Sequence, residues 1–121
     1  SAATARRALS QSGAEAVMIG RGAQGRPWLL AQVSHDLYGS PAPEVPQGGS
    51  FADMVRGHYD EMIRFYGAEL GWRVARKHLG WFMDTCGTPE GLRRAVLTAP
   101  DVQNTDQLLR EACILHDRAA A

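Results

Sequence analysis

The apolar run Ala16-Val-Met-Ile19, which ends at Gly20, constrains the fold of this chain more than any other feature of its sequence. No polar residue interrupts the run, which is typical of a strand buried on both faces in a parallel sheet. Such a strand needs neighbouring strands, but the residues on either side of it follow helical patterns. The sequence therefore predicts a piece of a larger α/β structure.

Three glycines and an arginine follow the predicted strand, namely Gly20, Arg21, Gly22 and Gly25. Glycine permits backbone angles that a side chain would forbid, and it lets main-chain N–H groups approach a ligand closely. A strand, a glycine turn with an arginine and then a helix is an arrangement that holds a phosphate group. Spacing alone fits a glycine-rich turn without a ligand equally well, and residues 40–50 lack the second strand that a dinucleotide fingerprint requires.

Helices are expected on both sides of the strand. Apolar residues at helical spacing predict a helix over residues 4–12 that ends at Gly13, and Pro27 suits the first turn of a helix reaching about Tyr38. This order reads as the last helix-strand-helix step of a parallel sheet. Without its neighbours the strand leaves backbone groups unpaired, so we expect this region to self-associate or to stay mobile when isolated.

Residues 40–49 hold three prolines and two glycines with little apolar content, which indicates a linker. We therefore expect one unit at residues 1–39 and a second at residues 50–121. Apolar residues recur with a helical period throughout the second unit, so it is predicted to be a helical bundle. Its expected helices cover residues 51–66, 69–85 and 88–98 and a final segment that includes Leu115.

Capping residues set the expected helix starts at Ser50, at Thr88 and at Asn104 or Thr105. The expected core of the bundle consists of large apolar side chains, namely Tyr59, Ile63, Trp72, Leu79, Phe82 and Leu109. His78 lies beside this apolar face and is expected to be a packed, hydrogen-bonded histidine. The fold class is thus predicted to be mainly α.

Three cations, Arg73, Arg76 and Lys77, fall at positions i, i+3 and i+4 of the second bundle helix and so share one exposed face. Their repulsion is unfavourable unless an anion such as phosphate compensates it. Arg93 and Arg94 project from the next helix and extend the positive stretch. A triplet of cations taken alone is more often a solvated helix face, so the pattern by itself favours that interpretation.

Length and composition exclude several classes of protein. A complete (β/α)₈ barrel needs about 250 residues, and this chain has 121. The formal net charge is zero, so nucleic acid would have to bind through a local patch. Cys86 and Cys113 lack a metal-ligand spacing, which predicts reduced thiols in the cytoplasm and no metal site. No apolar run approaches the roughly 20 residues of a membrane-spanning helix, so a soluble protein is expected.

Two motifs, Glu15–Trp28 and Arg73-Val-Ala-Arg-Lys-His-Leu-Gly-Trp81, occur in the order found in one family. They resemble the C-terminal part of the bacterial tRNA-dihydrouridine synthases, and the resemblance extends over nearly the whole chain. That family has an FMN-binding (β/α)₈ barrel followed by a helical domain, and it reduces selected uridines of tRNA with NADPH. The resemblance implies that residues 1–39 are the end of a truncated barrel and residues 50–121 a helical tRNA-binding domain.

The resemblance also implies roles for individual residues. Gly20 and Arg21 would lie at the FMN phosphate, whereas the family's catalytic cysteine and most flavin contacts lie upstream and are absent from these residues. The chain alone is therefore expected to be inactive. The resemblance reverses the preference for a solvated face and implies that the five cations bind tRNA, namely Arg73, Arg76, Lys77, Arg93 and Arg94.

A second hypothesis makes the helical unit a protein-interaction module attached to a different FMN or phosphate-binding barrel, since other FMN barrels also end strands with Gly-Arg. The segment Arg73–Trp81 discriminates between the two hypotheses. A flavoprotein specific for a small metabolite has no evident need for that motif, so the tRNA-modifying enzyme is the leading hypothesis.

Overall fold

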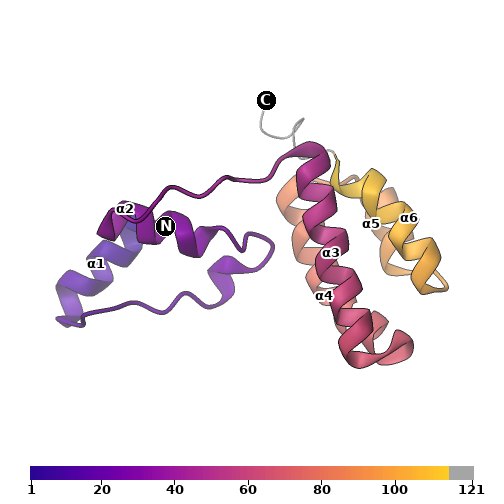
Figure 1. Cartoon of the computed structure of the whole chain (residues 1–121), viewed down its shortest axis with the longest axis horizontal. Coiled ribbons are helices and arrows are strands. Elements are labelled where there is room, and N and C mark those ends of the chain that lie inside the picture. The colour runs from indigo at the N-terminus through magenta and orange to yellow at the C-terminus, as the bar shows by residue number, and fades with distance from the viewer. Residues whose placement is uncertain (115–121) are drawn as a thin grey trace. The chain divides into compact units, whose positions relative to one another are not determined.

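The computed structural model describes residues 1–114, which divide into two compact units with the boundary between Val45 and Pro46. All regular elements in the described residues are helices (Figure 1). The first unit contains α1 (Ala2–Ser12), the 3₁₀ turn η1 (Arg21–Ala23) and α2 (Leu29–Tyr38). The second contains α3 (Gly48–Tyr66), α4 (Ala68–Cys86), α5 (Glu90–Leu97) and α6 (Val102–Cys113). The prediction of a mainly α chain is confirmed.

The first unit consists of two packed helices and the segment that joins them. Ser1 caps α1 in a capping box with Thr4, and Gly13 ends the helix with a φ of 68°. Arg6 ties the two helices together because its guanidinium donates to the carbonyl oxygen of Asp36 at 3.0 Å. Val33 is the one buried residue within α1 and α2, so this unit has little core of its own.

The strand predicted at residues 16–19 is not formed in the described part of the chain. A strand is defined by hydrogen bonds to a neighbouring strand, and none of residues 1–114 forms one beside this segment. Residues 16–19 instead run as an irregular segment between α1 and η1, with Met18 93% exposed. The apolar pattern predicted burial on both faces, whereas in the described residues Val17 and Ile19 are half-buried and Met18 is exposed.

The described part of the second unit consists of four helices, of which α3 and α4 form a hairpin (Figure 1). One residue, Gly67, joins the two helices with a φ of 80°, a backbone conformation that favours glycine. Helix α6 packs against α3 and α4, and α5 packs against α4 and α6. The core comprises large side chains with at most 2% exposure, including Phe51, Val55, Tyr59, Leu79, Met83, Val96 and Leu109.

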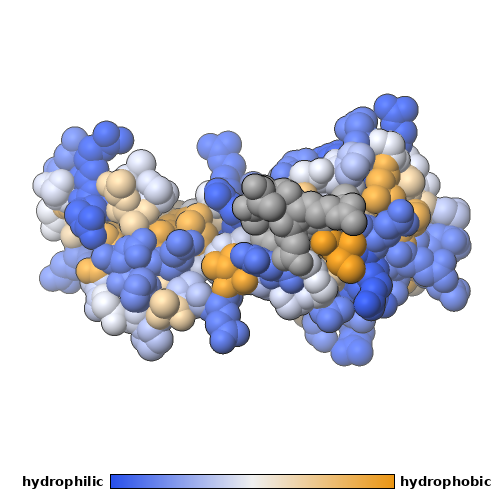
Figure 2. All heavy atoms as spheres, turned by 90° about the horizontal axis from the view of Figure 1, so that it is seen from above, coloured by the Kyte–Doolittle hydropathy of each residue, from blue (hydrophilic) through white to orange (hydrophobic). Residues whose placement is uncertain are grey.

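Four of the six predicted core residues are buried, namely Tyr59, Leu79, Phe82 and Leu109. Ile63 and Trp72 are only half-buried. Both lie at the margin of the helix stripes, where a helical period cannot tell a core position from a position beside it. Figure 2 shows hydrophobic residues at the surface of each unit, and the exposed large ones include Leu30, Phe65 and Leu70.

The predicted helix starts were wrong in detail. Helix α3 begins earlier, with Gln47 as its N-cap, and Ser50 lies in the first turn, where its Oγ accepts from the Gln47 N–H. Pro89 rather than Thr88 occupies the N-cap of α5, because the Thr88 hydroxyl donates to the Ala112 carbonyl oxygen at 2.9 Å. Asp101 caps α6, with its carboxylate accepting from the Asn104 N–H at 2.8 Å. Leu115 lies outside the described residues.

Candidate nucleic-acid interface

One face of α4 carries the cations that the sequence predicts to bind tRNA. Successive residues of an α-helix are turned by 100°, so positions three, four, seven and eleven residues after Arg73 lie on the same side as Arg73. These positions form one stripe with Arg73, and they are residues 76, 77, 80 and 84. Arg73 and Lys77 on this stripe are exposed, whereas Arg76 and Gly80 are partly or fully covered. Apart from Gly80, buried positions of α4 such as Leu79 and Ala75 lie on a different side of the helix.

A stacked pair on α4 holds Arg76. The guanidinium carbon Cζ of Arg76 lies 3.3 Å from the ring centroid of Trp72, which is a close cation–π contact. The indole N–H of Trp72 in turn donates to the Thr105 hydroxyl on α6 at 3.2 Å. Thr105 is itself fixed, because it donates to the Asp101 carbonyl oxygen at 2.8 Å. Helix α6 therefore orients the ring on which Arg76 lies.

The Nε of Arg76 is buried and has no hydrogen-bond partner among the described residues. A buried donor without a partner is uncommon in proteins and costs free energy. Arg56 in the same unit shows the ordinary arrangement, with two hydrogen bonds of 2.8 and 2.7 Å to the carboxylate of Asp106. That carboxylate raises the pKa of Arg56 through its hydrogen bond. Arg76 therefore lacks the carboxylate partner that Arg56 has in the same bundle.

Arg93 reaches the same face of α4 from α5. Its Nε donates to the Asp84 carboxylate at 3.1 Å, and its terminal nitrogen would lie 3.1 Å from a β-carbon built on Gly80. The absence of a side chain at position 80 therefore leaves the space across which Arg93 lies. The structure brings Arg93 to the stripe of Arg73, Arg76 and Lys77, although helix periodicity alone could not place α5 beside it.

The remaining cations are less constrained. Arg73 forms an ion pair of 3.2 Å with Glu69, but both side chains are more than 60% exposed, so this pair contributes little stability. Lys77 and Arg94 are exposed. Arg94 is adjacent to Arg93 in α5 and therefore points about 100° away from it around that helix. The structure does not bring Arg94 to the contact that Arg93 makes with α4.

Two histidines meet on another side of the hairpin. The rings of His58 and His78 are perpendicular, with centroids 5.3 Å apart, and His78 also packs edge to face with Trp81 at 5.0 Å. Burial lowers the pKa of both histidines, and the charges of His58 and Lys77 lower that of His78 further. His78 is therefore a packed, half-buried ring, as predicted, but the hydrogen bond expected for it is not formed within residues 1–114.

Both cysteines lie in the bundle core, with exposures of 1% for Cys86 and 0% for Cys113. The Cys86 sulfur lies 3.1 Å from the Thr88 hydroxyl, and hydrogen bonding to Cys86 together with burial raises the pKa of Cys113. In residues 1–114 no three histidine, cysteine or acidic side chains gather as a metal site would require. None of the described helices is long and apolar enough to cross a membrane.

The glycine-rich turn of the first unit is well exposed. Gly20 precedes η1, and the Ala23 N–H donates to the Gly20 carbonyl oxygen at 3.1 Å, so the first N–H groups of the turn have no partner within it. Arg21 is exposed, and a β-carbon at Gly20 would meet nothing within 4 Å. The turn therefore offers backbone donors and a cation to solvent.

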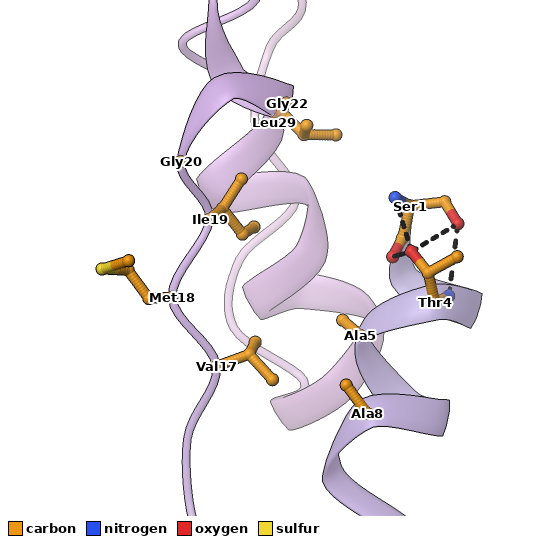
Figure 3. A pocket seen from close by; sticks show the side chains of 10 residues that line it. All are labelled: Ser1, Thr4, Ala5, Ala8, Val17, Met18, Ile19, Gly20, Gly22 and Leu29. Carbon is orange, nitrogen blue, oxygen red and sulfur yellow. Dashed lines mark hydrogen bonds between the residues drawn. The ribbon is translucent and has the colours of Figure 1, made fainter.

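A cavity of about 320 Å³ lies beside this turn, between residues 17–20 and α1. Figure 3 shows Val17 and Ile19 pointing towards the helices while Met18 points away from them. Most of the lining is apolar, from Ala5, Ala8 and Leu29 among others. This alternation gives the extended segment an apolar side towards α1 and leaves Met18 on the other side without cover in the first unit.

Comparison with known proteins identifies relatives over both units. A family model described as Dihydrouridine synthase (Dus) matches residues 1–117. A probable tRNA-dihydrouridine synthase of Rhodobacter capsulatus is 50% identical over 111 residues, which cover 92% of this chain and 34% of that protein. tRNA-dihydrouridine synthase B of Vibrio cholerae is 40% identical over 106 residues, covering 87% of this chain and 32% of the relative.

A probable tRNA-dihydrouridine synthase of Mycobacterium tuberculosis is 39% identical over 101 residues, which cover 84% of this chain and 26% of that protein. The chain thus spans about a third or less of the length of these curated relatives. No solved structure matches it significantly.

Proposed function

The chain belongs to the dihydrouridine synthase family, and from this membership we propose that it forms the C-terminal part of a flavin-dependent tRNA-dihydrouridine synthase. The complete enzyme reduces uridine to 5,6-dihydrouridine in tRNA with NADPH and FMN, and it acts in the cytoplasm. The first unit is the end of its barrel, with the boundary in residues 40–49, and the helical unit binds tRNA. The alternative of an interaction module on another barrel is not favoured, because one family model spans both units.

The gathering of cations on one face of α4 is the observation that supports tRNA binding by the helical unit. Arg73, Arg76 and Lys77 share it, and Arg93 joins it through Asp84 and the space above Gly80. The major groove of an RNA helix is too deep and narrow for side chains to read its base edges, so a protein recognises double-stranded RNA largely through phosphates, 2′-hydroxyls and shape. Cations gathered from two helices suit such contacts, and Arg94 adds charge nearby.

The turn at Gly20 and Arg21 is proposed to hold the FMN phosphate. The residues present fit a phosphate group, since the turn combines exposed N–H groups, a glycine open to close approach and a guanidinium. Bound FMN supplies the hydride chemistry of the reaction. Cys86 and Cys113 are buried in the bundle, so neither can protonate a substrate, and the catalytic cysteine belongs to a part of the enzyme outside these residues.

The apolar segment at residues 16–19 supports the assignment of the first unit to a barrel. Met18 is exposed and no strand pairs with the segment within the described chain. In a complete barrel, strands on both sides would cover these residues. When the unit is isolated, the same surface favours self-association.

Replacing Arg76 and Lys77 by alanine in the complete enzyme tests the proposed function. Each phosphate contact that is lost should reduce the magnitude of the log–log salt slope of tRNA binding by about 0.7 to 0.9. The Michaelis constant for tRNA should rise, while flavin content and NADPH oxidation in the absence of tRNA stay close to wild type.

Arg64→Ala is the matched control for this experiment. Arg64 is an exposed cation on α3 whose ion-pair partner is Glu61, and it lies outside the α4 face. Its replacement should leave tRNA affinity and the salt slope unchanged. If the Arg76 and Lys77 replacements also leave both quantities unchanged, the face is a solvated surface and the proposed role is wrong.

A further inference from the structure

The end of the α3–α4 hairpin exposes three large apolar side chains, which we call the hairpin-tip surface. They are Phe65, Tyr66 and Leu70, with exposures of 81%, 44% and 52%. The rings of Phe65 and Tyr66 pack edge to face with their centroids 4.8 Å apart. Exposed apolar side chains that lie together in this way mark interaction sites more often than single ones do. The hairpin-tip surface is therefore a candidate binding surface.

A cavity of about 380 Å³ gives this surface its shape. Tyr66 and Leu70 supply its apolar walls, and Gly67 and Ala68 leave room beside them because their side chains are absent or small. Phe65 and Tyr66 also border a second cavity, of about 370 Å³. The hairpin tip thus offers a recess with an aromatic wall, which suits a flat ring that stacks.

The polar part of the first cavity indicates the class of ligand. Arg73 and Glu69 line it together with Tyr66, and they form an ion pair of 3.2 Å. A guanidinium donates hydrogen bonds and a carboxylate accepts them, so this edge suits a neutral group that carries both acceptors and donors. A phosphate there would also be repelled by the carboxylate. A nucleobase combines a flat face for the ring with a polar edge for the ion pair.

The hairpin-tip surface is continuous with the α4 face through one residue. Arg73 lines the cavity beside Tyr66, and it also shares the α4 face with Lys77, one turn further along the helix. Proteins that bind single-stranded RNA combine cations along the backbone with aromatic side chains on which bases stack. Both features are present on this hairpin and Arg73 is common to them, which favours RNA over a protein partner as the occupant.

We propose that the hairpin-tip surface binds an unpaired base of RNA, which stacks on Tyr66 while Phe65 supports that ring from its edge. This inference rests on the proposed function and goes beyond it, because the cations of the α4 face contact phosphates and carry no preference for unpaired bases. Only a base outside a duplex can expose its flat face to a side chain. The hairpin-tip surface therefore distinguishes unpaired from paired RNA.

Replacement of both rings by leucine tests the proposal. The double variant Phe65→Leu and Tyr66→Leu keeps large apolar side chains but removes the aromatic faces. It is made in the complete enzyme and titrated with a short unstructured RNA and with an RNA duplex of the same length. Affinity for the unstructured RNA should fall by about fivefold to tenfold, because the stacked base is lost. Affinity for the duplex should stay within about twofold, because its bases are stacked inside the helix.

Two further variants and the salt dependence complete the experiment. Tyr66→Phe retains the ring and should restore the binding that leucine removes. Tyr38→Leu makes the same chemical change at an exposed tyrosine of α2, outside the hairpin-tip surface, and should leave both affinities unchanged. The leucine double variant should keep the wild-type salt slope, because no phosphate contact is removed, whereas replacing cations of the α4 face should reduce it.

The outcomes separate this inference from the proposed function. If the double variant binds the unstructured RNA as wild type does, or weakens binding of both RNAs equally, no base stacks at the hairpin tip and the inference is overturned. A lower melting temperature or flavin content with unchanged RNA affinity overturns it too, since the rings then pack against protein. In these cases the proposed function stands. If wild-type enzyme shows no salt-dependent binding of tRNA, the proposed role of the helical unit fails, and this inference fails with it.

Discussion

A β-carbon at Gly71 on α4 would lie 2.8 Å from the carbonyl oxygen of Met62 on α3. It would also lie 2.9 Å from the Cα of Ile63, so the close contacts are with backbone that cannot move aside. Gly71 therefore sets the distance between the two helices of the hairpin. Because the α4 face is presented from this hairpin, the arrangement of its cations depends on a residue that carries no charge.

Gly71→Ala should destabilise the helical unit. The added methyl group must push α3 and α4 apart, and overpacking of this kind costs about 1 to 3 kcal/mol in the free energy of unfolding. Gly57→Ala is the opposite case, because its β-carbon meets nothing and helix propensity improves by about 1 kcal/mol. Urea unfolding followed by circular dichroism measures both changes. Equal stability of the two variants would show that the helices separate without cost.

Leu79→Ala should also destabilise the unit, by about 2 to 5 kcal/mol, because a fully buried leucine leaves a cavity when it is truncated. Leu79 is 1% exposed and lies in the middle of α4. Leu70→Ala is a suitable control on the same helix, since Leu70 is 52% exposed and should change the free energy of unfolding little. Losses of similar size in the two variants would contradict the described core.

Stability should fall as the pH drops below about 6.5, the usual pKa of histidine. The folded state lowers the pKa of His58 and His78, chiefly by burial. Below that pH the unfolded chain therefore binds more protons than the folded chain, which favours unfolding. The stabilisation is present above pH 6.5 and is lost as the pH falls towards the lowered values.

Melting temperatures between pH 7.5 and 5.5 measure this effect. A variant with both His58→Gln and His78→Gln keeps polar side chains but cannot titrate in that range, so its melting temperature should depend less on pH than that of the wild type. The effect should be modest, because the burial that lowers the two pKa values is only partial and both histidines keep contact with solvent. Parallel profiles for the two proteins would assign the pH dependence to other groups.

The sequence predicted the helices of the second unit well, because a long amphipathic period fixes both the type of element and its buried face. Tyr59 and Leu79 were identified as core in this way, and both are buried. Helix starts were predicted less well. The Thr88 hydroxyl makes a tertiary hydrogen bond to α6, and local preference cannot foresee a partner that is distant in sequence.

The contacts that shape the candidate interface could not be derived from helical spacing. A period places Arg73, Arg76 and Lys77 on one face, but the approach of Arg93 depends on how α5 packs and on the space left by Gly80. The close contact of Gly71 with α3 could not be predicted from the sequence either, since a glycine in a helix pattern normally indicates only lower helix stability. The strand predicted at residues 16–19 is not formed, because a local apolar pattern cannot show whether a partner strand is present, and none lies within residues 1–114.

Amide hydrogen exchange should differ between the two units of the chain. Helix α1 contains no buried residue and α2 contains only Val33, so little apolar burial opposes their local opening. The amides of α3 and α4 around Val55 and Leu79 should exchange at rates set by unfolding of the whole bundle. Mass spectrometry of a verified monomer measures both rates, and equal protection in the two units would contradict this prediction.

Arg21→Gln should lower the FMN occupancy of the complete enzyme if the glycine-rich turn holds the phosphate. The replacement removes a charged donor from an exposed turn, and losing charge-assisted hydrogen bonds to a phosphate should weaken binding by about tenfold. Arg26→Gln is the matched control, because Arg26 is an exposed cation of the same loop whose guanidinium reaches only the Gly22 carbonyl oxygen, at 3.5 Å. Flavin absorbance after dialysis reports occupancy, and tRNA affinity should be unchanged in both variants. Equal flavin retention by Arg21→Gln and wild type would move the phosphate site away from this turn.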